Sequence, residues 1–299
     1  MNHLEVPLFS LKHTLDAGHT FSWNYWEAGG ATYATTVDDG VAVKVWQDTL
    51  ELHLLNYESS KPFDAPGFFS RRFRLHDDLE AVYGEISRDE VLAQAVQKYK
   101  GLRMVKDPFW ECVVSFISSA QNQIPRIRES MNLIRQNYGE AIDWNDRVYY
   151  SFPPPEVVAQ VSVSDFFEKT KTAFRAKHII KAAQQIVSGE IPPQRELEAM
   201  PFEQARREVS RLFGVGEKVA DCVCLYSLGK MESFPIDTWI AAALRDHYPG
   251  FPNYEKKGEK AYREASAAAI NHFGRNAGYA QQYLYIFKRK NSRQGPVLE

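Results

Sequence analysis

One lysine and one aspartate carry the most specific chemical signal in this sequence. They lie in residues 211–239, RLFGVGEKVADCVCLYSLGKMESFPIDTW. Lys218 falls in the first turn of a predicted helix, where the helix dipole disfavours a positive charge. A neutral amine is what a Schiff-base nucleophile requires, although a lysine is far more often a solvated surface residue. Asp237 is the carboxylate that could act beside this amine.

The position of Asp237 predicts a second, structural role. It comes between FPI and the apolar-periodic segment TWIAAALRDHY, which predicts a helix. Aspartate is a favoured N-cap, and a capping carboxylate is held rigidly by its hydrogen bond to the backbone. We therefore expect Asp237 both to cap this helix and to face Lys218 across a groove.

The residues before the lysine predict a helical hairpin. Residues 204–213 are typical of one apolar helix, Gly214 and Gly216 turn the chain, and residues 217–228 predict a second helix. Closely spaced glycines let a backbone approach another molecule. The free N–H groups at the start of the second helix form a phosphate site, so the hairpin could bind DNA backbone without reading its sequence. An ordinary αα-hairpin explains the Gly-x-Gly turn equally well.

The motif LFGVGEKVADCVCL followed by FPID resembles the lysine-containing branch of the helix–hairpin–helix DNA glycosylase superfamily. It is most similar to the 8-oxoguanine DNA glycosylase/AP lyases. The glycine hairpin, Lys218 and Asp237 match that family in identity and spacing, whereas monofunctional relatives keep the aspartate and lack the lysine. The resemblance covers roughly residues 15–290.

The composition fits a globular protein of two or three subdomains, with 299 residues, 44% hydrophobic and 25% charged. Because the net charge is −2, a DNA-binding surface must gather its positive charge on one face. Three cysteines are too few for a disulfide framework or a four-cysteine iron–sulfur site. We expect a monomer without a cofactor, although the hairpin could hold a structural cation. We also expect no signal peptide and no membrane span, and a location in the cytoplasm of a prokaryote.

The pattern along the chain predicts an α+β fold. Residues 1–80 are rich in aromatic and β-branched residues, with turns at Gly29-Gly30 and Asp38-Asp39-Gly40, so an N-terminal antiparallel sheet domain is expected. From Leu79 the pattern becomes helical and stays so, with Asp107 predicted to cap a helix at 109. Residues 81–299 therefore predict a helical catalytic domain, whose subdomains 120–210 and 211–299 flank a cleft for DNA and base.

The resemblance implies four residues that contact the damaged base. Residues 17–23, AGHTFSW, are similar to the family pattern Ser-Gly-Gln-Ser-Phe-x-Trp. In the family this glycine, here Gly18, accepts a hydrogen bond from N7–H of the oxidised base, a proton that guanine lacks. The family also implies that Gln281 bonds the Watson–Crick edge, and that Tyr285 and Cys222 hold the two ring faces. On local pattern alone, Gly18 is explained by a turn, and a helical cysteine or tyrosine by the core.

Two further segments resemble the parts of the family that contact the rest of the DNA. The polar run SSAQNQ corresponds to an Asn-rich tract, which implies that Gln121, followed by Asn122, fills the hole left by the base. Arg126 would read the orphaned cytosine. In the basic segment KTKTAFRAKHIIK, Phe174 would wedge beside the damaged pair and Arg175 would be the second cytosine reader. A solvated loop and a solvated helix face explain these segments on their own.

The sequence also departs from the family. Gln121 stands in place of an asparagine, and Trp239 stands where a histidine contacts phosphate. The resulting prediction is a bifunctional DNA glycosylase/AP lyase that flips out and excises 8-oxoguanine opposite cytosine. Two alternatives are a related glycosylase for another damaged base, such as an alkylated purine or an oxidised pyrimidine, and a non-catalytic helix–hairpin–helix DNA-binding module.

Overall fold

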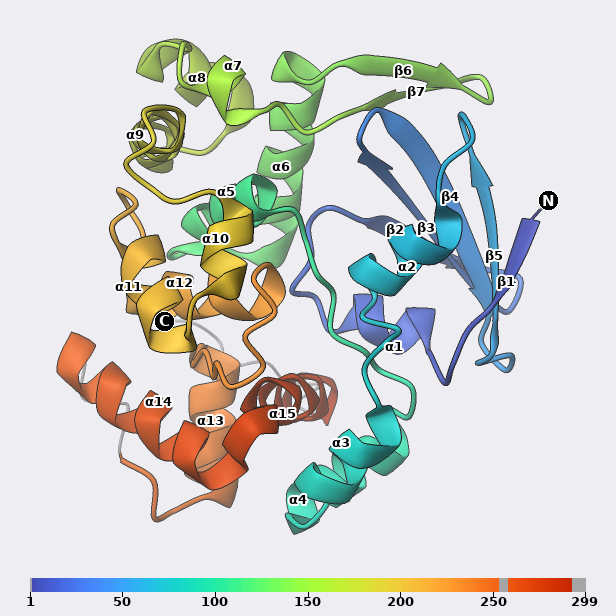
Figure 1. Ribbon diagram of the computed structural model, residues 1–299, viewed down its shortest axis with the longest axis vertical. Coiled ribbons are helices and arrows are strands. Elements are labelled where there is room, and N and C mark those ends of the chain that lie inside the picture. The colour runs from blue at the N-terminus through green and yellow to red at the C-terminus, as the bar shows by residue number, and fades with distance from the viewer. Residues whose placement is uncertain (1, 253–257, 292–299) are drawn as a thin grey trace.

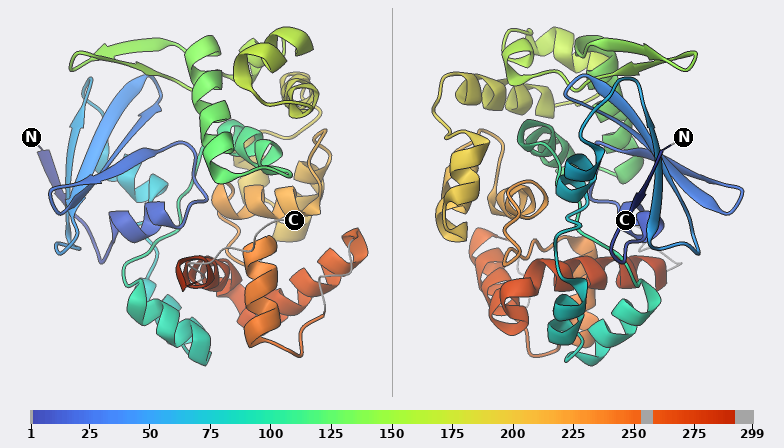
Figure 2. Two further views of the ribbon diagram at one scale, coloured as in Figure 1. Left: turned by 180° about the vertical axis from the view of Figure 1, so that it is seen from behind. Right: turned by 45° about the vertical axis from the view of Figure 1, so that its right-hand side comes forward.

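The computed structural model describes residues 2–252 and 258–291 of the chain (Figure 1). A β-sheet formed by the N-terminal residues stands beside a larger body of helices, and Figure 2 shows the same arrangement from two further sides. The predicted α+β class, with an N-terminal antiparallel sheet followed by helices, is confirmed.

The sheet has five antiparallel strands in the order β1-β5-β4-β3-β2. Their bounds are β1 Asn2–Glu5, β2 Asn24–Ala28, β3 Ala31–Asp38, β4 Val41–Asp48 and β5 Leu54–Ser59. The predicted turns are present: Gly29 and Gly30 join β2 to β3, and Asp39 and Gly40 join β3 to β4, all with positive φ. Such turns match the twist of the flanking strands. The sheet packs on its own apolar core, which includes Trp23, Val43, Val45, Phe69 and Phe73.

Helices α1 and α2 pack on the sheet, and the other helices form two groups with α5 and α12 between them (Figure 1). Their bounds are α1 Leu11–Asp16, α2 Ala65–Arg72, α3 Leu79–Ile86, α4 Glu90–Lys98, α5 Phe109–Ser119, α6 Ile124–Tyr138, α7 Pro155–Val158, α8 Val163–Thr170, α9 Arg175–Val187, α10 Gln194–Ala199, α11 Phe202–Ser210, α12 Glu217–Tyr226, α13 Thr238–His247, α14 Glu259–Phe273 and α15 Ala277–Asn291. One apolar core runs through both groups. Within the described ranges, no helix has the length and apolarity that crossing a bilayer requires.

The prediction that the chain stays helical after Leu79 is wrong at one place. Strands β6 (Ala141–Trp144) and β7 (Arg147–Tyr150) form a separate two-stranded hairpin. Asn145 and Asp146 turn the chain with φ of 50° and 57°, and these two residue types tolerate the left-handed region better than most. The Asn-Asp pair between short aromatic and β-branched runs was the available sequence signal.

Three helix ends also differ from the prediction. Helix α11 ends at Ser210 rather than at Phe213, so Leu212 is buried in the turn whereas Phe213 is 43% exposed. Helix α12 ends at Tyr226 rather than at residue 228. Pro108, and not Asp107, is the N-cap of α5. The Asp107 carboxylate does not cap the helix because it accepts hydrogen bonds from Thr20, Ser22 and Arg72 instead.

Candidate active site

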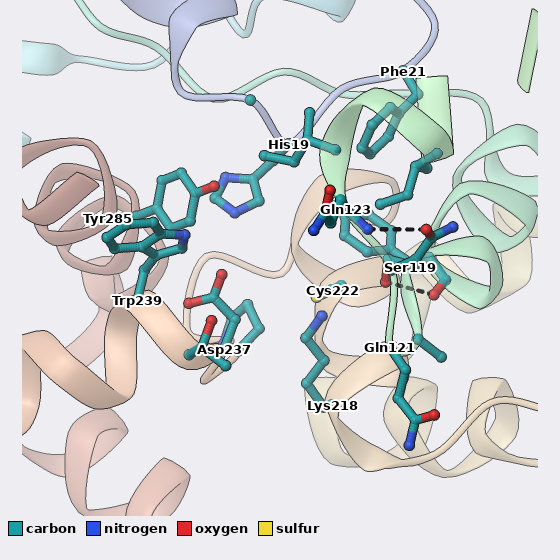
Figure 3. A pocket seen from close by; sticks show the side chains of 18 of the residues that line it. His19, Phe21, Ser119, Gln121, Gln123, Lys218, Cys222, Asp237, Trp239 and Tyr285 are labelled. Atoms are coloured by element: carbon teal, nitrogen blue, oxygen red, sulfur yellow. Dashed lines mark hydrogen bonds between the residues drawn. The ribbon is translucent and has the colours of Figure 1, made fainter. Parts of the chain in front are cut away.

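A pocket of about 750 Å³ lies where the α1–β2 connection, the α5–α6 loop, α12, the start of α13 and α15 meet (Figure 3). Cavities of this size hold small molecules and nucleobases. The predicted site residues that line it are Gly18, Gln121, Asn122, Arg126, Lys218, Cys222, Asp237, Trp239, Gln281 and Tyr285. Four others, Phe174, Arg175, Gly214 and Gly216, are not among its lining residues.

Lys218 lies in the first turn of α12, as predicted, and its partly buried side chain extends into the pocket (Figure 3). The helix begins at Gly216, which provides no side-chain cap. The amine lies 5.8 Å from the centroid of the Phe116 ring. A lysine in this setting is neither fully solvated nor locked in an ion pair with its own helix, so its amine is available to a molecule in the pocket.

Asp237 is the N-cap of α13, and its Oδ1 accepts a hydrogen bond of 2.8 Å from the N–H of Ile240. Burial raises the pKa of the Asp237 carboxyl, and the charge of Lys218 and the N–H groups of Ile240 and Trp239 oppose that rise. Figure 3 shows Lys218 and Asp237 extending from different walls into the same pocket. A rigid carboxylate beside an amine can orient the amine and stabilise a nearby positive charge.

The wall formed by Cys222, Gln281 and Tyr285 is buried. Burial raises the pKa of the Cys222 thiol to about 12, against the effect of Lys218, so Cys222 presents a neutral, apolar surface. The amide of Gln281 already has internal partners. Its Nε2 donates to the Pro235 carbonyl over 3.2 Å, and its Oε1 accepts from the Tyr226 hydroxyl over 3.1 Å.

Gly18 has a φ of +77°, which favours glycine. A Cβ at this position would come within 2.6 Å of Nη1 of Arg289, which itself donates to the Asp16 carbonyl over 3.2 Å. Gly18 therefore fits closely against α15: its conformation favours glycine, and any side chain would have to displace the guanidinium of Arg289.

The sequence reasoning missed Asp107, which positions the loop that carries Gly18. Its Oδ1 accepts hydrogen bonds from the hydroxyls of Thr20 (3.0 Å) and Ser22 (2.6 Å) and from Arg72 (3.2 Å). Its N–H donates to the carbonyl of Tyr226, at the end of α12, over 2.7 Å. Asp107 thus ties the Gly18 loop to the helix of Lys218. No local sequence pattern predicts this role of Asp107, since its partners lie far away along the chain.

The α5–α6 loop carries the polar run, and Arg175 holds it from outside the pocket. The Nε of Arg175 donates to the Ala120 carbonyl over 2.9 Å, and its Nη2 donates to Ala120 and, over 3.0 Å, to the Gln121 carbonyl. Gln121 has a φ of 49°, unusual for a residue other than glycine. Arg126 is exposed at the pocket mouth. The two arginines expected to act together therefore stand in different environments, one free and one bound to the loop.

The glycines of the hairpin serve different purposes. A Cβ on Gly214, whose φ is +85°, would lie 2.6 Å from the Cβ of His178. Gly214 is thus required by packing of the hairpin on α9, and its predicted approach to DNA stays a prediction. Gly216 has open space around it, so the start of α12 remains accessible. Phe174, next to His178 on α9, is 56% exposed.

The sequence reasoning also missed His19 and Phe21, which both line the pocket (Figure 3). The available signal was a histidine in place of glutamine within the otherwise similar pattern at residues 17–23. In the described part of the chain, no group of three histidine, cysteine or carboxylate side chains could hold a metal ion. The three cysteines are free and buried.

Comparisons with known proteins identify the family of the chain. Residues 3–113 match the family described as 8-oxoguanine DNA glycosylase, N-terminal domain. The chain is 30% identical to the probable N-glycosylase/DNA lyase of Methanothermobacter thermautotrophicus, over 96% of both chains. It superposes on MBOgg1 in complex with a low affinity DNA ligand with a TM-score of 0.86, at 32% identity over 97% of this chain and 96% of that one.

A second solved structure is that of Clostridium acetobutylicum 8-oxoguanine glycosylase/lyase in complex with double-stranded DNA containing cytosine opposite 8-oxoguanine. The TM-score is 0.83 and the identity 28%, over 97% of this chain and 94% of that one. Each of these two structural similarities covers nearly the whole chain, and therefore both the sheet and the helical body. The chain belongs to the N-glycosylase/DNA lyase family, within the 8-oxoguanine glycosylases of the helix–hairpin–helix superfamily.

Proposed function

We propose that this protein excises 8-oxoguanine opposite cytosine from duplex DNA and then cleaves the strand at the resulting site. The observation that carries the proposal is that Lys218 and Asp237 line one pocket large enough for an extruded purine nucleotide. An amine cannot reach a sugar inside a stacked duplex, so the damaged nucleotide must first be flipped out. The relationship to N-glycosylase/DNA lyases supports the same reaction.

The chemistry proceeds through a covalent enzyme–DNA intermediate. The neutral amine of Lys218 attacks C1′, and the bond from C1′ to the base breaks as the base leaves with the bonding electrons. Asp237 orients the amine and stabilises the positive charge that develops on the sugar. Loss of a proton from nitrogen and opening of the sugar give an iminium. A proton then leaves C2′ and the 3′ phosphate departs, which cuts the strand on that side.

The lining residues suggest how the lesion is recognised. The Gly18 carbonyl would accept a hydrogen bond from N7–H, which 8-oxoguanine has and guanine lacks. Cys222 and Tyr285 would enclose the base from two sides. Gln281 would bond the Watson–Crick edge of the base. Its side-chain amide keeps one N–H and one oxygen lone pair that its hydrogen bonds with Pro235 and Tyr226 do not use.

The cytosine left behind would be read at the pocket mouth. Arg126 is exposed there, and donors aimed at N3 and O2 of cytosine would disfavour adenine, which presents a donor of its own on that edge. Gln121 would fill the vacated space, with Asn122 beside it and Phe174 wedged next to the pair. Arg175 would contribute as a second reader by turning from the loop carbonyls towards the base.

The phosphates beside the lesion would be bound at the start of α12. Gly216 leaves the first N–H groups of that helix open, and Trp239 can donate from its indole N–H. A cation held by the hairpin is a further prediction. We also propose that the protein acts in the cytoplasm, since its three free, buried cysteines suit a reducing compartment.

The decisive experiment is reduction with borohydride during the reaction on a duplex with 8-oxoguanine opposite cytosine. Wild type should give a covalent protein–DNA adduct, whereas Lys218→Gln should bind the duplex and give none. Cleavage by the wild type without a trappable adduct would exclude the mechanism. A panel of duplexes with alkylated purines and oxidised pyrimidines, each opposite all four bases, tests the alternative that another lesion is preferred.

A further inference from the structure

His19 lies among the proposed base-recognition residues, although the mechanism gives it no task. It follows Gly18 in the segment between α1 and β2, and its side chain lines the pocket (Figure 3). The imidazole packs between two tyrosines. Its centroid is 4.9 Å from that of Tyr226 with an interplanar angle of 18°, and 4.0 Å from that of Tyr285 with an angle of 54°.

The imidazole covers the ring on which the extruded base should stack. A centroid separation of 4.0 Å leaves no space for a third ring between His19 and Tyr285. The guanidinium carbon of Arg289 lies over the same tyrosine, 5.9 Å from its centroid. Tyr285 is therefore already engaged by two side chains in the protein without DNA, and a base that stacks on it has to replace one of them.

His19 is the more readily replaced of the two. Arg289 is anchored by a hydrogen bond to the Asp16 carbonyl. The imidazole of His19 has a hydrogen bond with the side chain of Gln282. Its Nδ1, however, is inaccessible to water and has no hydrogen-bond partner among the described residues, an arrangement that weakens its hold on the site. Burial, followed by the charges of Lys218 and Arg289, lowers the pKa of His19 to about 3, against the effect of the hydrogen bond with Gln282. The ring is thus neutral, and its departure moves no charge.

We propose that His19 is a specificity-determining residue, which occupies the stacking position on Tyr285 until a purine takes that position. This inference rests on the proposed function, because it requires an extruded base to stack on Tyr285. A base stays in the pocket only if its own stacking and its bond to the Gly18 carbonyl outweigh the contacts of His19 with the two tyrosines. Guanine lacks the N7–H for that bond, so it loses the competition more often than 8-oxoguanine does.

Two substitutions of His19 should act in opposite directions. We would measure single-turnover excision of 8-oxoguanine opposite cytosine, divided by the rate of cleavage of an abasic site opposite cytosine, which contains no base to insert. His19→Ala should raise this ratio by about threefold to tenfold, the effect of one aromatic pair. His19→Phe should lower it by a similar factor, because a phenyl ring keeps the stack and leaves no unpaired nitrogen.

A binding measurement isolates the discrimination. In the Lys218→Gln background, which prevents cleavage, His19→Ala should tighten binding to an undamaged guanine:cytosine duplex more than to the lesion duplex. His19→Gln is a third variant, which removes the ring but keeps a polar group, so it should act in the same direction as His19→Ala. The matched control is His13→Ala: His13 also packs on a tyrosine, with its centroid 5.5 Å from that of Tyr99, but it does not line the pocket.

The outcomes separate this inference from the proposed function. If His19→Ala lowers the ratio of base excision to abasic-site cleavage while the protein still cleaves both duplexes, His19 holds the base rather than competing with it, and the inference is overturned alone. If the wild type cleaves neither duplex, the proposed function is wrong and the inference falls with it. An unchanged ratio in both His19→Ala and His19→Phe also overturns the inference.

Discussion

The Nε of Arg206 lies 2.7 Å from the carboxylate of Asp221, and this buried ion pair joins the two helices of the hairpin that carries Lys218. Asp221 is fully buried on α12, and the Tyr262 hydroxyl donates to its other oxygen over 2.5 Å. Burial raises the pKa of the Asp221 carboxyl to about 6, against the effects of Arg206 and Tyr262. The position of the amine thus depends on an ion pair whose carboxylate is fully buried and whose guanidinium is largely buried.

Removing one partner of this ion pair should lower the stability of the protein strongly, although the pair does not line the pocket. Arg206→Gln leaves a buried carboxylate without its cation, and we expect a loss of about 3 kcal/mol in the free energy of unfolding at pH 7.5. The loss should be smaller at pH 5. Without Arg206 the folded-state pKa of Asp221 rises further, so the carboxyl can take up a proton and its burial then costs less. Urea unfolding at the two pH values measures both effects.

A matched control is Arg211→Gln, which breaks an ion pair with Glu208 on the protein surface. We expect a change below about 1 kcal/mol at either pH, because exposed ion pairs contribute little. Equal losses for the two variants would contradict the view that Arg206 acts through a buried charge.

Gly18 and Gly189 permit a clean separation of backbone strain from steric conflict. Their φ values are +77° and +76°, but a Cβ on Gly18 would meet Arg289 at 2.6 Å, whereas a Cβ on Gly189 would meet nothing. Alanine at either position should cost about 1–2 kcal/mol in strain. Only Gly18→Ala should also displace the Arg289 guanidinium from its place over Tyr285 in the pocket wall, and we expect excision of 8-oxoguanine to fall by about tenfold to 100-fold. Excision rates and thermal unfolding of both variants test this, and an active Gly18→Ala protein would contradict it.

Local patterns predicted the parts of the molecule whose cause is local. Paired glycines and the Asp-Gly pair marked the two hairpin turns of the sheet, and both turns are present. Asp237 was expected to cap a helix from the residues around it, and it does so. These features depend on a few consecutive residues, so they can be predicted from a short stretch of sequence.

Residues whose partners are distant could not be assigned in this way. Asp107 reads as a helix cap, yet it binds side chains from α2 and from the Gly18 loop. Gly214 reads as a point of approach for a ligand, yet it packs on His178. A polar or small residue can have several possible partners, and the tertiary structure decides which of them it contacts. The local sequence pattern does not show which partner that is.

Arg126 and Arg175 should differ in what their loss does, although both are expected to read cytosine. Arg126→Ala removes an exposed side chain, so selectivity for the opposite base should fall with little change in stability. Arg175→Ala also removes the donors to the Ala120 and Gln121 carbonyls. We expect it to loosen the α5–α6 loop and to lower stability by about 1–3 kcal/mol.

Excision opposite each of the four bases, together with hydrogen exchange of residues 118–123, distinguishes the two roles. Arg175→Lys is an informative intermediate, because a lysine keeps the charge but cannot donate to two carbonyls in the same fork geometry. If Arg175→Ala leaves the exchange of the loop unchanged, its hydrogen bonds do not hold the loop in solution.

The ionisation of Asp237 should limit the rate of base excision at low pH. Its carboxylate form supports the amine and the developing sugar cation, and burial raises its pKa above the ordinary value of 3.8. The single-turnover rate of base excision should therefore rise with pH through a midpoint above 3.8. Asp237→Asn should abolish this rise with pH and slow base release by about 100-fold or more, with little effect on stability, because asparagine is also a good N-cap.

The matched control is Asp78→Asn. Asp78 is likewise an N-cap, accepting from the N–H of Ala81 over 3.1 Å at the start of α3, and it does not line the pocket. Both variants keep a capping side chain and lose one carboxylate, which is partly buried at the pocket in Asp237 and exposed in Asp78. Asp78→Asn should retain the excision rate and its dependence on pH. If the two variants lose activity equally, the effect of Asp237 belongs to helix capping and not to the chemistry at the sugar.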